Sequence, residues 1–382
     1  MKKLLLIPLI ISLSLTLLEA KKQSDEIDHI ALAALLLRDG HIDKADAALE
    51  SVDLEDTSID LMRYHTLKAL VALKQGLYAE SNKHFLLSFK EGQEDKTIFL
   101  YMAQNSFKLQ KYKEALGYLD AAAELSKEKA SLYSLRAEIH WRLDEQEKAL
   151  GVLQEAMQRF NNEYTLLKQR FFYFISLGLY QSALNDAHIY LNHAQLDEKS
   201  ALVFINAFKK AEQLDDAIAL AEELLLKFDQ SAKLTALLAY LYIDKGMLQS
   251  AADLFDKASI KDTQYTKESA ELYRRAKNFV LSLYKNSQLL DTQEKLKQRI
   301  AIYLEYKAYE KVVVSRNALE RSGLLKDENI RYALAYSYYM VGEFDKCERE
   351  LKKLTKSELF TKATELRKNI QKCKNDGWEC EL

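Results

Sequence analysis

The chain has 382 residues, 48% of them hydrophobic, and is therefore long enough to bury a large core or to form an elongated array. Its 55 Lys and Arg balance 57 Asp and Glu, which argues against electrostatic attraction to nucleic acid or to an anionic membrane. Pro8 is the only proline and there are ten glycines, so little in the sequence breaks helices and we expect an all-α protein.

Residues 1–20 have the pattern of a secretory signal peptide. Two lysines precede an apolar run from Leu4 to Leu18, and the small residue Ala20 is followed by polar sequence. The alternative is an uncleaved anchor, but this run of about fifteen residues is shorter than the roughly 20 that cross a bilayer. We therefore predict cleavage, a periplasmic or secreted mature chain, and no membrane span within it.

A repeat extends over residues 21–260. A small residue recurs seven times, at intervals of 36 residues once and 34 residues thereafter, and a turn position lies five residues before each copy. The recurring small residues and turn positions indicate pairs of amphipathic helices joined by tight turns. Such pairs must stack on one another to bury their apolar faces. The small residues are Ala45, Ser81, Ala115, Ala149, Ala183, Ala217 and Ala251, and the turn positions are Gly40, Gly76, Gln110, Asp144, Gly178, Glu212 and Gly246.

The seventh unit, around Ala236–Ile260, has the clearest pattern. Its Ala239, Tyr242, Gly246, Ala251, Phe255 and Ala258 resemble the tetratricopeptide repeat, although the closing proline of that repeat is missing from every unit. The resemblance implies a right-handed superhelical α-solenoid of helical hairpins. It also implies a concave groove lined by the first helix of each hairpin.

The register changes after Ile260. Residues 261–290 form an irregular helical segment, which is either an extra helix or a degenerate hairpin. Residues 291–355 contain two further hairpins, the first opened by the cap Asp291 with Glu294 three residues later. In residues 356–382 an apolar stripe that includes Leu359, Ala363 and Leu366 predicts a capping helix, followed by a tail.

The three cysteines are not equivalent. Cys347 occupies the small position of its unit, which indicates packing. Cys373 and Cys380 lie seven positions apart with a glycine turn between them, and in an oxidising compartment they form either a disulfide or two free thiols. We favour the disulfide.

No pattern of catalysis is present. The seven histidines form no HExxH motif, GxSxG and Gly-rich phosphate loops are absent, and acidic pairs such as Asp215 and Asp216 are typical of a helix surface. We therefore predict no enzyme activity, no catalytic residues, no metal site and no cofactor.

The resemblance also implies which side chains line the groove. They are mostly cationic, amide-bearing or aromatic, a composition that suits an extended peptide. The candidates are Lys74, Gln104, Phe107, Lys108, Trp141, Arg142, Lys168, Phe172, Asn206, Lys209, Tyr240, Tyr336 and Tyr339.

These observations lead to a functional prediction. We expect a non-enzymatic protein–protein interaction scaffold of the bacterial cell envelope that binds a protein or peptide segment in its groove, in an export, envelope-biogenesis or motor assembly. The alternative is a glycan- or peptidoglycan-associated binding protein, because Trp141, Phe172 and Tyr240 are rings that stack on sugars. Neither hypothesis involves nucleic acid.

Overall fold

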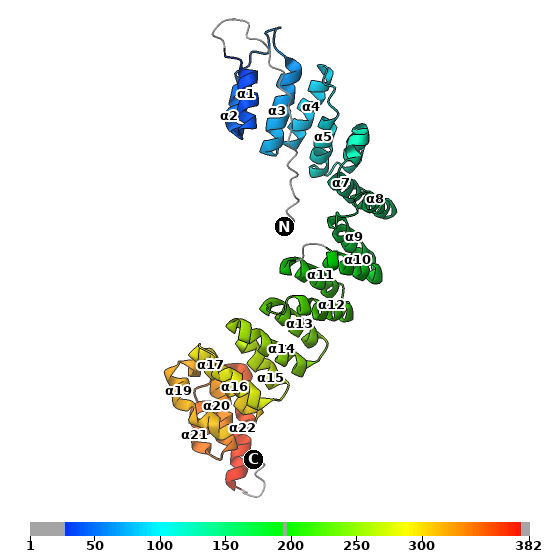
Figure 1. Cartoon of the computed structure of the whole chain (residues 1–382). Coiled ribbons are helices and arrows are strands. Elements are labelled where there is room, and N and C mark those ends of the chain that lie inside the picture. The colour runs from blue at the N-terminus through cyan, green and yellow to red at the C-terminus, as the bar shows by residue number, and fades with distance from the viewer. Residues whose placement is uncertain (1–26, 194–196, 376–382) are drawn as a thin grey trace. The chain divides into compact units, whose positions relative to one another are not determined.

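The computed structural model describes residues 27–193 and 197–375, and all regular secondary structure within these ranges is helical (Figure 1). The all-α prediction is therefore confirmed. The predicted signal peptide, Cys380 and the end of the tail lie outside the described residues. No helix of the described part is long and apolar enough to span a bilayer.

The helices are paired into antiparallel hairpins, and the chain divides into two compact units at Phe160 and Asn161. This division falls inside the block of seven predicted repeats. The hairpins of the first unit are α1 (His29–Arg38) with α2 (Ile42–Glu50), α3 (Leu61–Gln75) with α4 (Tyr78–Lys90), α5 (Thr97–Lys108) with α6 (Tyr112–Ala121), and α7 (Ala130–Arg142) with α8 (Gln146–Arg159).

The second unit continues the same α-solenoid architecture and ends in a single helix. Its elements are α9 (Thr165–Leu177) with α10 (Tyr180–His193), α11 (Glu198–Lys210) with α12 (Leu214–Lys227), α13 (Ala232–Asp244) with α14 (Leu248–Lys261), α15 (Thr266–Arg275) with α16 (Phe279–Ser287), α17 (Thr292–Glu305) with α18 (Tyr309–Val314) and α19 (Arg316–Arg321), α20 (Glu328–Met340) with α21 (Phe344–Leu351), and α22 (Ser357–Asn375). Short 3₁₀ helices η1 (Ala123–Lys127), η2 (Thr263–Tyr265) and η3 (Leu324–Lys326) lie in connections.

One residue in the left-handed conformation separates the two helices of every described hairpin. Its φ lies between 58° and 81° in all ten, which ends the first helix and redirects the chain into the second. The seven turn positions expected from the sequence all have this conformation. The full set is Gly40, Gly76, Gln110, Asp144, Gly178, Glu212, Gly246, Lys277, Lys307 and Gly342.

The residue five positions after each turn is completely buried. This holds for the seven expected small residues and also for Ser282, Val312 and Cys347. Residues 261–290 are therefore a degenerate hairpin, α15 with α16, rather than a single extra helix. Its turn residue Lys277 follows Gly246 by 31 residues instead of 34, which explains the change of register.

The second helix of the ninth hairpin is broken. In place of one continuous second helix, α18 ends at Val314 and α19 begins at Arg316. Between them the Ser315 hydroxyl donates a hydrogen bond to the carbonyl of Lys311 at 2.7 Å, a side-chain-to-backbone bond that bends helices.

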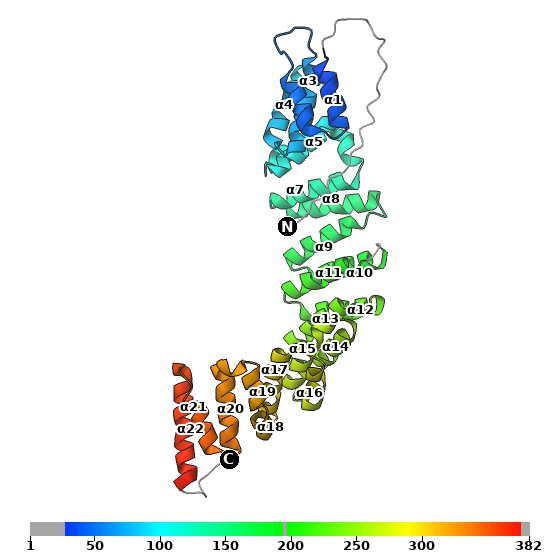
Figure 2. The same cartoon turned by 90° about the vertical axis from the view of Figure 1, so that its left-hand side faces the viewer.

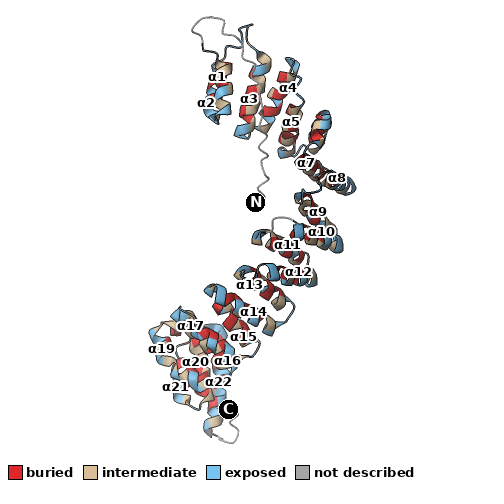
Figure 3. Cartoon of the chain, in the orientation of Figure 1, coloured by how far each residue is buried: buried red, intermediate tan, exposed pale blue. Residues whose placement is uncertain are grey.

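Buried residues, coloured red in Figure 3, lie in both units, and the apolar ones among them form separate clusters in each unit. In the second unit one cluster extends from Phe171 to Tyr273 and another from Ile300 to Ile370. Polar side chains are buried between these two clusters. This polar layer comprises Ser259, Thr266, Ser269, Ser282, Lys285, Asn286 and Gln298.

The last helix, α22, covers the end of the array as predicted. It lies beside α20 and α21 (Figure 2), and its Leu359, Ala363, Leu366 and Ile370 are buried in the C-terminal apolar cluster. Most of its other side chains are exposed and polar, which protects the terminal hairpin from solvent.

The close approach of α13 and α14 gives a first stability prediction. Ala239 and Ala251 are fully buried where these helices meet, beside Phe255. Ala251→Trp should overpack this contact and lower stability by about 1–3 kcal/mol or more. Thermal unfolding followed by circular dichroism measures the effect, and Ala219→Trp on the exposed face of α12 is the matched control. An unchanged melting temperature for Ala251→Trp would show that the two helices do not meet in this register.

Candidate functional site

A hollow of about 540 Å³ lies between the first helices of two consecutive hairpins, α9 and α11. Phe172 and Asn206, both expected to line the groove, contribute to its wall together with Lys210. The remaining lining residues are Ile175, Tyr180, Val203, Ala207 and Ala211. We call this hollow the α9–α11 pocket.

The pocket exists because two adjacent phenylalanines of α9 point to different sides. Phe171 is fully buried and makes edge-to-face contacts with Phe204 at 4.6 Å and Phe208 at 5.6 Å between ring centroids, which fixes α9 against α11. Phe172 is consequently left exposed on the open side of the same helix. Because the Phe171 ring is buried, the adjacent Phe172 ring faces the pocket.

The start of α11 is fixed by a capping carboxylate. Asp197 accepts a hydrogen bond from the Ser200 backbone N–H at 2.5 Å, which satisfies an otherwise unpaired donor and lowers the pKa of Asp197. The helix then carries Val203, Asn206, Ala207 and Lys210 at spacings of three and four residues, so they share one face.

The pocket wall is apolar with two polar groups beside it. The Asn206 amide nitrogen donates to the Leu202 carbonyl at 2.8 Å, which leaves the amide oxygen as an acceptor without a partner among the described residues. The exposed Lys210 ammonium likewise makes no ion pair within the described ranges. One acceptor and one cation therefore lie beside an apolar hollow.

Lys209 and Tyr240 form a separate cluster next to the pocket. The Lys209 ammonium lies 2.9 Å from the Asp244 carboxylate and 6.0 Å from the centre of the Tyr240 ring. The Tyr240 ring rests edge-on against Phe255 and remains partly exposed. The ion pair offsets one of the positive charges that the sequence assigned to the groove.

Lys168 also has a structural contact. Its ammonium lies 5.9 Å from the centre of the ring of Tyr190, a side chain that is itself buried. A cation over an aromatic face stabilises the packing of α9 on α10. This position makes Lys168 less available to a ligand than an extended lysine.

The predicted groove residues of the first unit lie on the first helices of their hairpins. The Phe107 ring packs against Tyr112 of its own hairpin at 5.8 Å, and the Arg142 guanidinium donates to Glu138 at 2.8 Å. Lys74 and Lys108 are exposed, whereas Gln104 and Trp141 are half-buried.

The two predicted groove tyrosines of α20, Tyr336 and Tyr339, differ in their burial. Tyr339 is 5% exposed and packs against Phe344 at 5.9 Å, so it is a core side chain and the groove assignment is wrong for it. The reason is that α21 lies over this part of α20. Tyr336 is half-buried, with its ring edge-on to Tyr309 at 5.8 Å.

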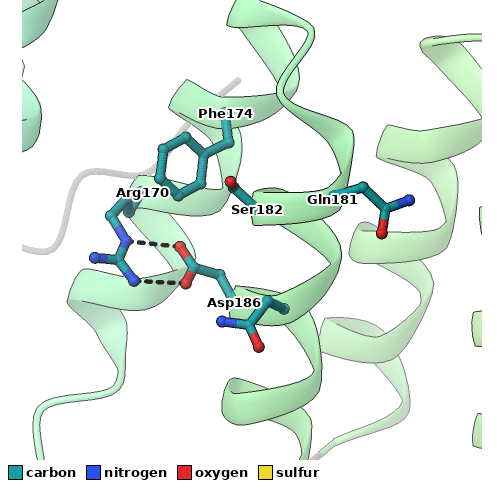
Figure 4. A pocket seen from close by; sticks show the side chains of 6 residues that line it. Arg170, Phe174, Gln181, Ser182 and Asp186 are labelled. Atoms are coloured by element: carbon teal, nitrogen blue, oxygen red, sulfur yellow. Dashed lines mark hydrogen bonds and ion pairs between the residues drawn. The ribbon is translucent and has the colours of Figure 1, made fainter.

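A second hollow, of about 330 Å³, lies between α9 and α10 (Figure 4). Its Arg170 guanidinium binds the Asp186 carboxylate through two hydrogen bonds, of 2.8 Å and 2.6 Å, and lies 5.4 Å from the centre of the Phe174 ring. Asp186 is 1% exposed, so this bidentate pair joins the two helices. Sequence reasoning missed the pair, although its two members lie eight residues on either side of the turn residue Gly178.

Two histidines meet in the second hairpin, a contact that the sequence did not suggest. The Nδ1 atoms of His65 on α3 and His84 on α4 are 3.0 Å apart. Burial lowers the pKa of both imidazoles, and the charge of His65 lowers that of His84 further. In the part of the chain that the structure describes, no three His, Cys, Asp or Glu side chains are placed to hold a metal ion.

The predicted disulfide stays a prediction, because Cys380 lies outside the described residues. Cys373 lies near the end of α22. Cys347 is a buried free thiol, and burial raises its pKa to about 12. Its packing role is therefore confirmed.

Comparison with known proteins gives only structural likenesses. No family model and no curated protein matches the sequence. The C-terminal part of a TPR repeat-containing protein from Cytophaga hutchinsonii is 15% identical, with 64% of this chain and 94% of that chain covered and a TM-score of 0.45. A tetratricopeptide repeat protein from Parabacteroides merdae is 14% identical over 60% and 91% of the two chains, with a TM-score of 0.40. PilF from Pseudomonas aeruginosa is 15% identical over 53% and 91%, with a TM-score of 0.39.

Proposed function

We propose that this chain, an all-α array of hairpins resembling tetratricopeptide repeats, is a non-enzymatic scaffold that binds an extended segment of another protein along its first helices. The observation that carries the proposal is the α9–α11 pocket. Two residues that the repeat register assigned to a groove, Phe172 and Asn206, line this one hollow.

The chemistry of the pocket suits a peptide with an apolar anchor. A large apolar side chain would fill the space beside Phe172, Ile175 and Val203 and displace water from it. The Asn206 amide oxygen would accept a backbone N–H of the segment, and Lys210 would pair with an acidic residue close to the anchor. Burial of the anchor supplies most of the affinity, while the polar groups fix its orientation.

The compartment is part of the proposal. The N-terminal pattern of residues 1–20 supports export, and the partner would then be another protein of the cell envelope.

The experiment is capture of partners from cell envelopes, followed by their identification and a binding measurement with the purified partner. We expect Phe172→Ala/Asn206→Ala/Lys210→Ala to weaken binding at least about tenfold, because it removes anchor contacts that together contribute at least about 1.4 kcal/mol. All three side chains are at least partly exposed, so the helices should remain folded.

The matched control is Gln249→Ala/Lys257→Ala, which truncates two exposed side chains on the outer face of α14. It should bind as the wild type does. Equal recovery of every partner by the triple variant would disprove the pocket assignment. Retention of the wild type on isolated sacculi stripped of protein would favour the glycan-binding alternative instead, for which the exposed rings of Phe172 and Tyr240 are the candidate stacking surfaces.

A further inference from the structure

The second helix of the eighth hairpin, α16, exposes apolar side chains to solvent. Val280 is 77% exposed and Tyr284, one turn later on the same face, is 58% exposed, with Leu281 beside them. Leu290, just after the helix, is 94% exposed. A soluble protein seldom leaves such neighbouring residues uncovered unless they contact a partner.

The other hairpins show which residue types normally occupy the position of Val280. Val280 and Tyr284 lie two residues before and two residues after the buried Ser282. At the position equivalent to Val280, the nine other hairpins of the described chain carry only Asp, Glu, Lys, Gln or Ala. Five of them are acidic, at Asp43, Glu147, Asp215, Glu310 and Asp345. The position therefore normally carries a residue suited to water, and α16 differs from the other described hairpins in carrying an exposed valine there.

Opposite charges lie at the two ends of this apolar face. The exposed turn residue Lys277 precedes α16 and makes no ion pair among the described residues. Asp291 follows the helix, is exposed, and accepts the backbone N–H groups of Gln293 and Glu294. Tyr284 lies seven residues from each of them, at the centre of the arrangement.

We propose that α16 is a self-association surface, on which α16 of a second copy of this chain packs in antiparallel orientation. A two-fold axis near Tyr284 would place this residue against the same residue of the other copy. It would also bring Lys277 of each copy toward Asp291 of the other. A surface that is apolar at its centre and oppositely charged at its ends is complementary to its own inverted copy.

The surroundings of α16 disfavour a lipid bilayer as the occupant. Asp256 of α14 forms an ion pair with Lys285 of α16, and Asp253 of α14 is exposed on the outer side of the neighbouring helix. A flat membrane in contact with α16 would meet these carboxylates, whereas one helix of a second copy lies along α16 without covering α14. An interface of one helix per copy is small, so the dimer is expected to dissociate on dilution.

Sedimentation equilibrium of the full chain, produced with its own N-terminus so that cellular processing is retained, tests the proposal. Over about 1–100 μM we expect a monomer–dimer equilibrium that Val280→Glu shifts at least tenfold toward monomer, since it buries a charge at the interface. Gln249→Glu occupies the same register position on α14 and should leave the equilibrium unchanged. A chain that stays monomeric throughout, or a dimer that Val280→Glu does not weaken, would overturn the proposal.

Cross-linking locates the axis independently. Tyr284→Cys should form a disulfide between two copies on mild oxidation, whereas Ala219→Cys, the equivalent exposed position on α12, should not. Equal cross-linking of the two variants would count against an axis at Tyr284. Because the surface lies on a second helix and the α9–α11 pocket on first helices, Val280→Glu should leave partner capture intact.

Discussion

Phe171→Ala is expected to lower the free energy of unfolding of the second unit by about 3–5 kcal/mol, the usual cost of truncating a buried phenylalanine. The ring is completely buried and contacts both Phe204 and Phe208 of α11, so its loss leaves a cavity between two hairpins. Urea unfolding followed by circular dichroism measures the change.

Phe172→Ala is the control for this prediction, because it makes the same chemical change one residue along the same helix. Phe172 is exposed, so its truncation should cost less than about 1 kcal/mol. If the two variants unfolded at the same urea concentration, α9 would not present the two rings to opposite sides. The α9–α11 pocket would then lose its structural basis.

Asp256→Ala should destabilise the chain by about 3 kcal/mol, because it leaves the buried ammonium of Lys285 without its counter-charge. The Lys285 side chain is 7% exposed, its hydrogen-bond partners Ser259 and Gln288 lie at 3.4 Å and 3.5 Å, and the centre of the Tyr284 ring lies 5.7 Å from its ammonium. Asp256 itself is 30% exposed, which places the expected loss at the lower end of the range for buried pairs. Thermal and urea unfolding both report it.

Lys285→Met provides the contrasting variant. It replaces the buried cation by an apolar side chain of similar length, and we expect a change within about 1 kcal/mol or a gain in stability. The double variant Asp256→Ala/Lys285→Met should recover most of what Asp256→Ala loses. If Asp256→Ala proved harmless on its own, Lys285 would not depend on that carboxylate.

The repeat was predictable from the sequence where its turn residues were spaced regularly. The hairpins up to Ile260 and the capping helix follow from the spacing of small residues and from one apolar stripe. For the eighth hairpin the sequence left an extra helix and a degenerate hairpin open, because the interval before its turn residue Lys277 is three residues shorter than the regular 34. Packing of α15 and α16 holds a lysine in a conformation that its intrinsic preference disfavours.

The sequence predicted where the candidate site lies, but it did not predict which charged side chains there form ion pairs. The register brought Phe172 and Asn206 to one pocket, since both lie on first helices of consecutive hairpins. The contact of Lys209 with Asp244 of α13 was not visible, because a side-chain partner on a neighbouring hairpin depends on rotamers that the sequence pattern does not encode. Tyr339 was misassigned for a related reason, since α21 lies over it.

The polar layer between the two apolar clusters of the second unit affects how that unit unfolds. In stacked helical hairpins, cooperativity is transmitted through nearest-neighbour contacts, most strongly through shared apolar area. Across this layer the contacts of α16 with α17 include directional bonds, such as those from the Asn286 amide to the Lys295 carbonyl at 2.9 Å and to Gln298 at 3.1 Å, beside the ring contact of Phe279 with Tyr306 at 5.1 Å. Urea and water compete with such bonds more readily than with a continuous core. We therefore expect α17 to α22 to unfold locally as one block, while α9 to α16 keep their protection against hydrogen exchange.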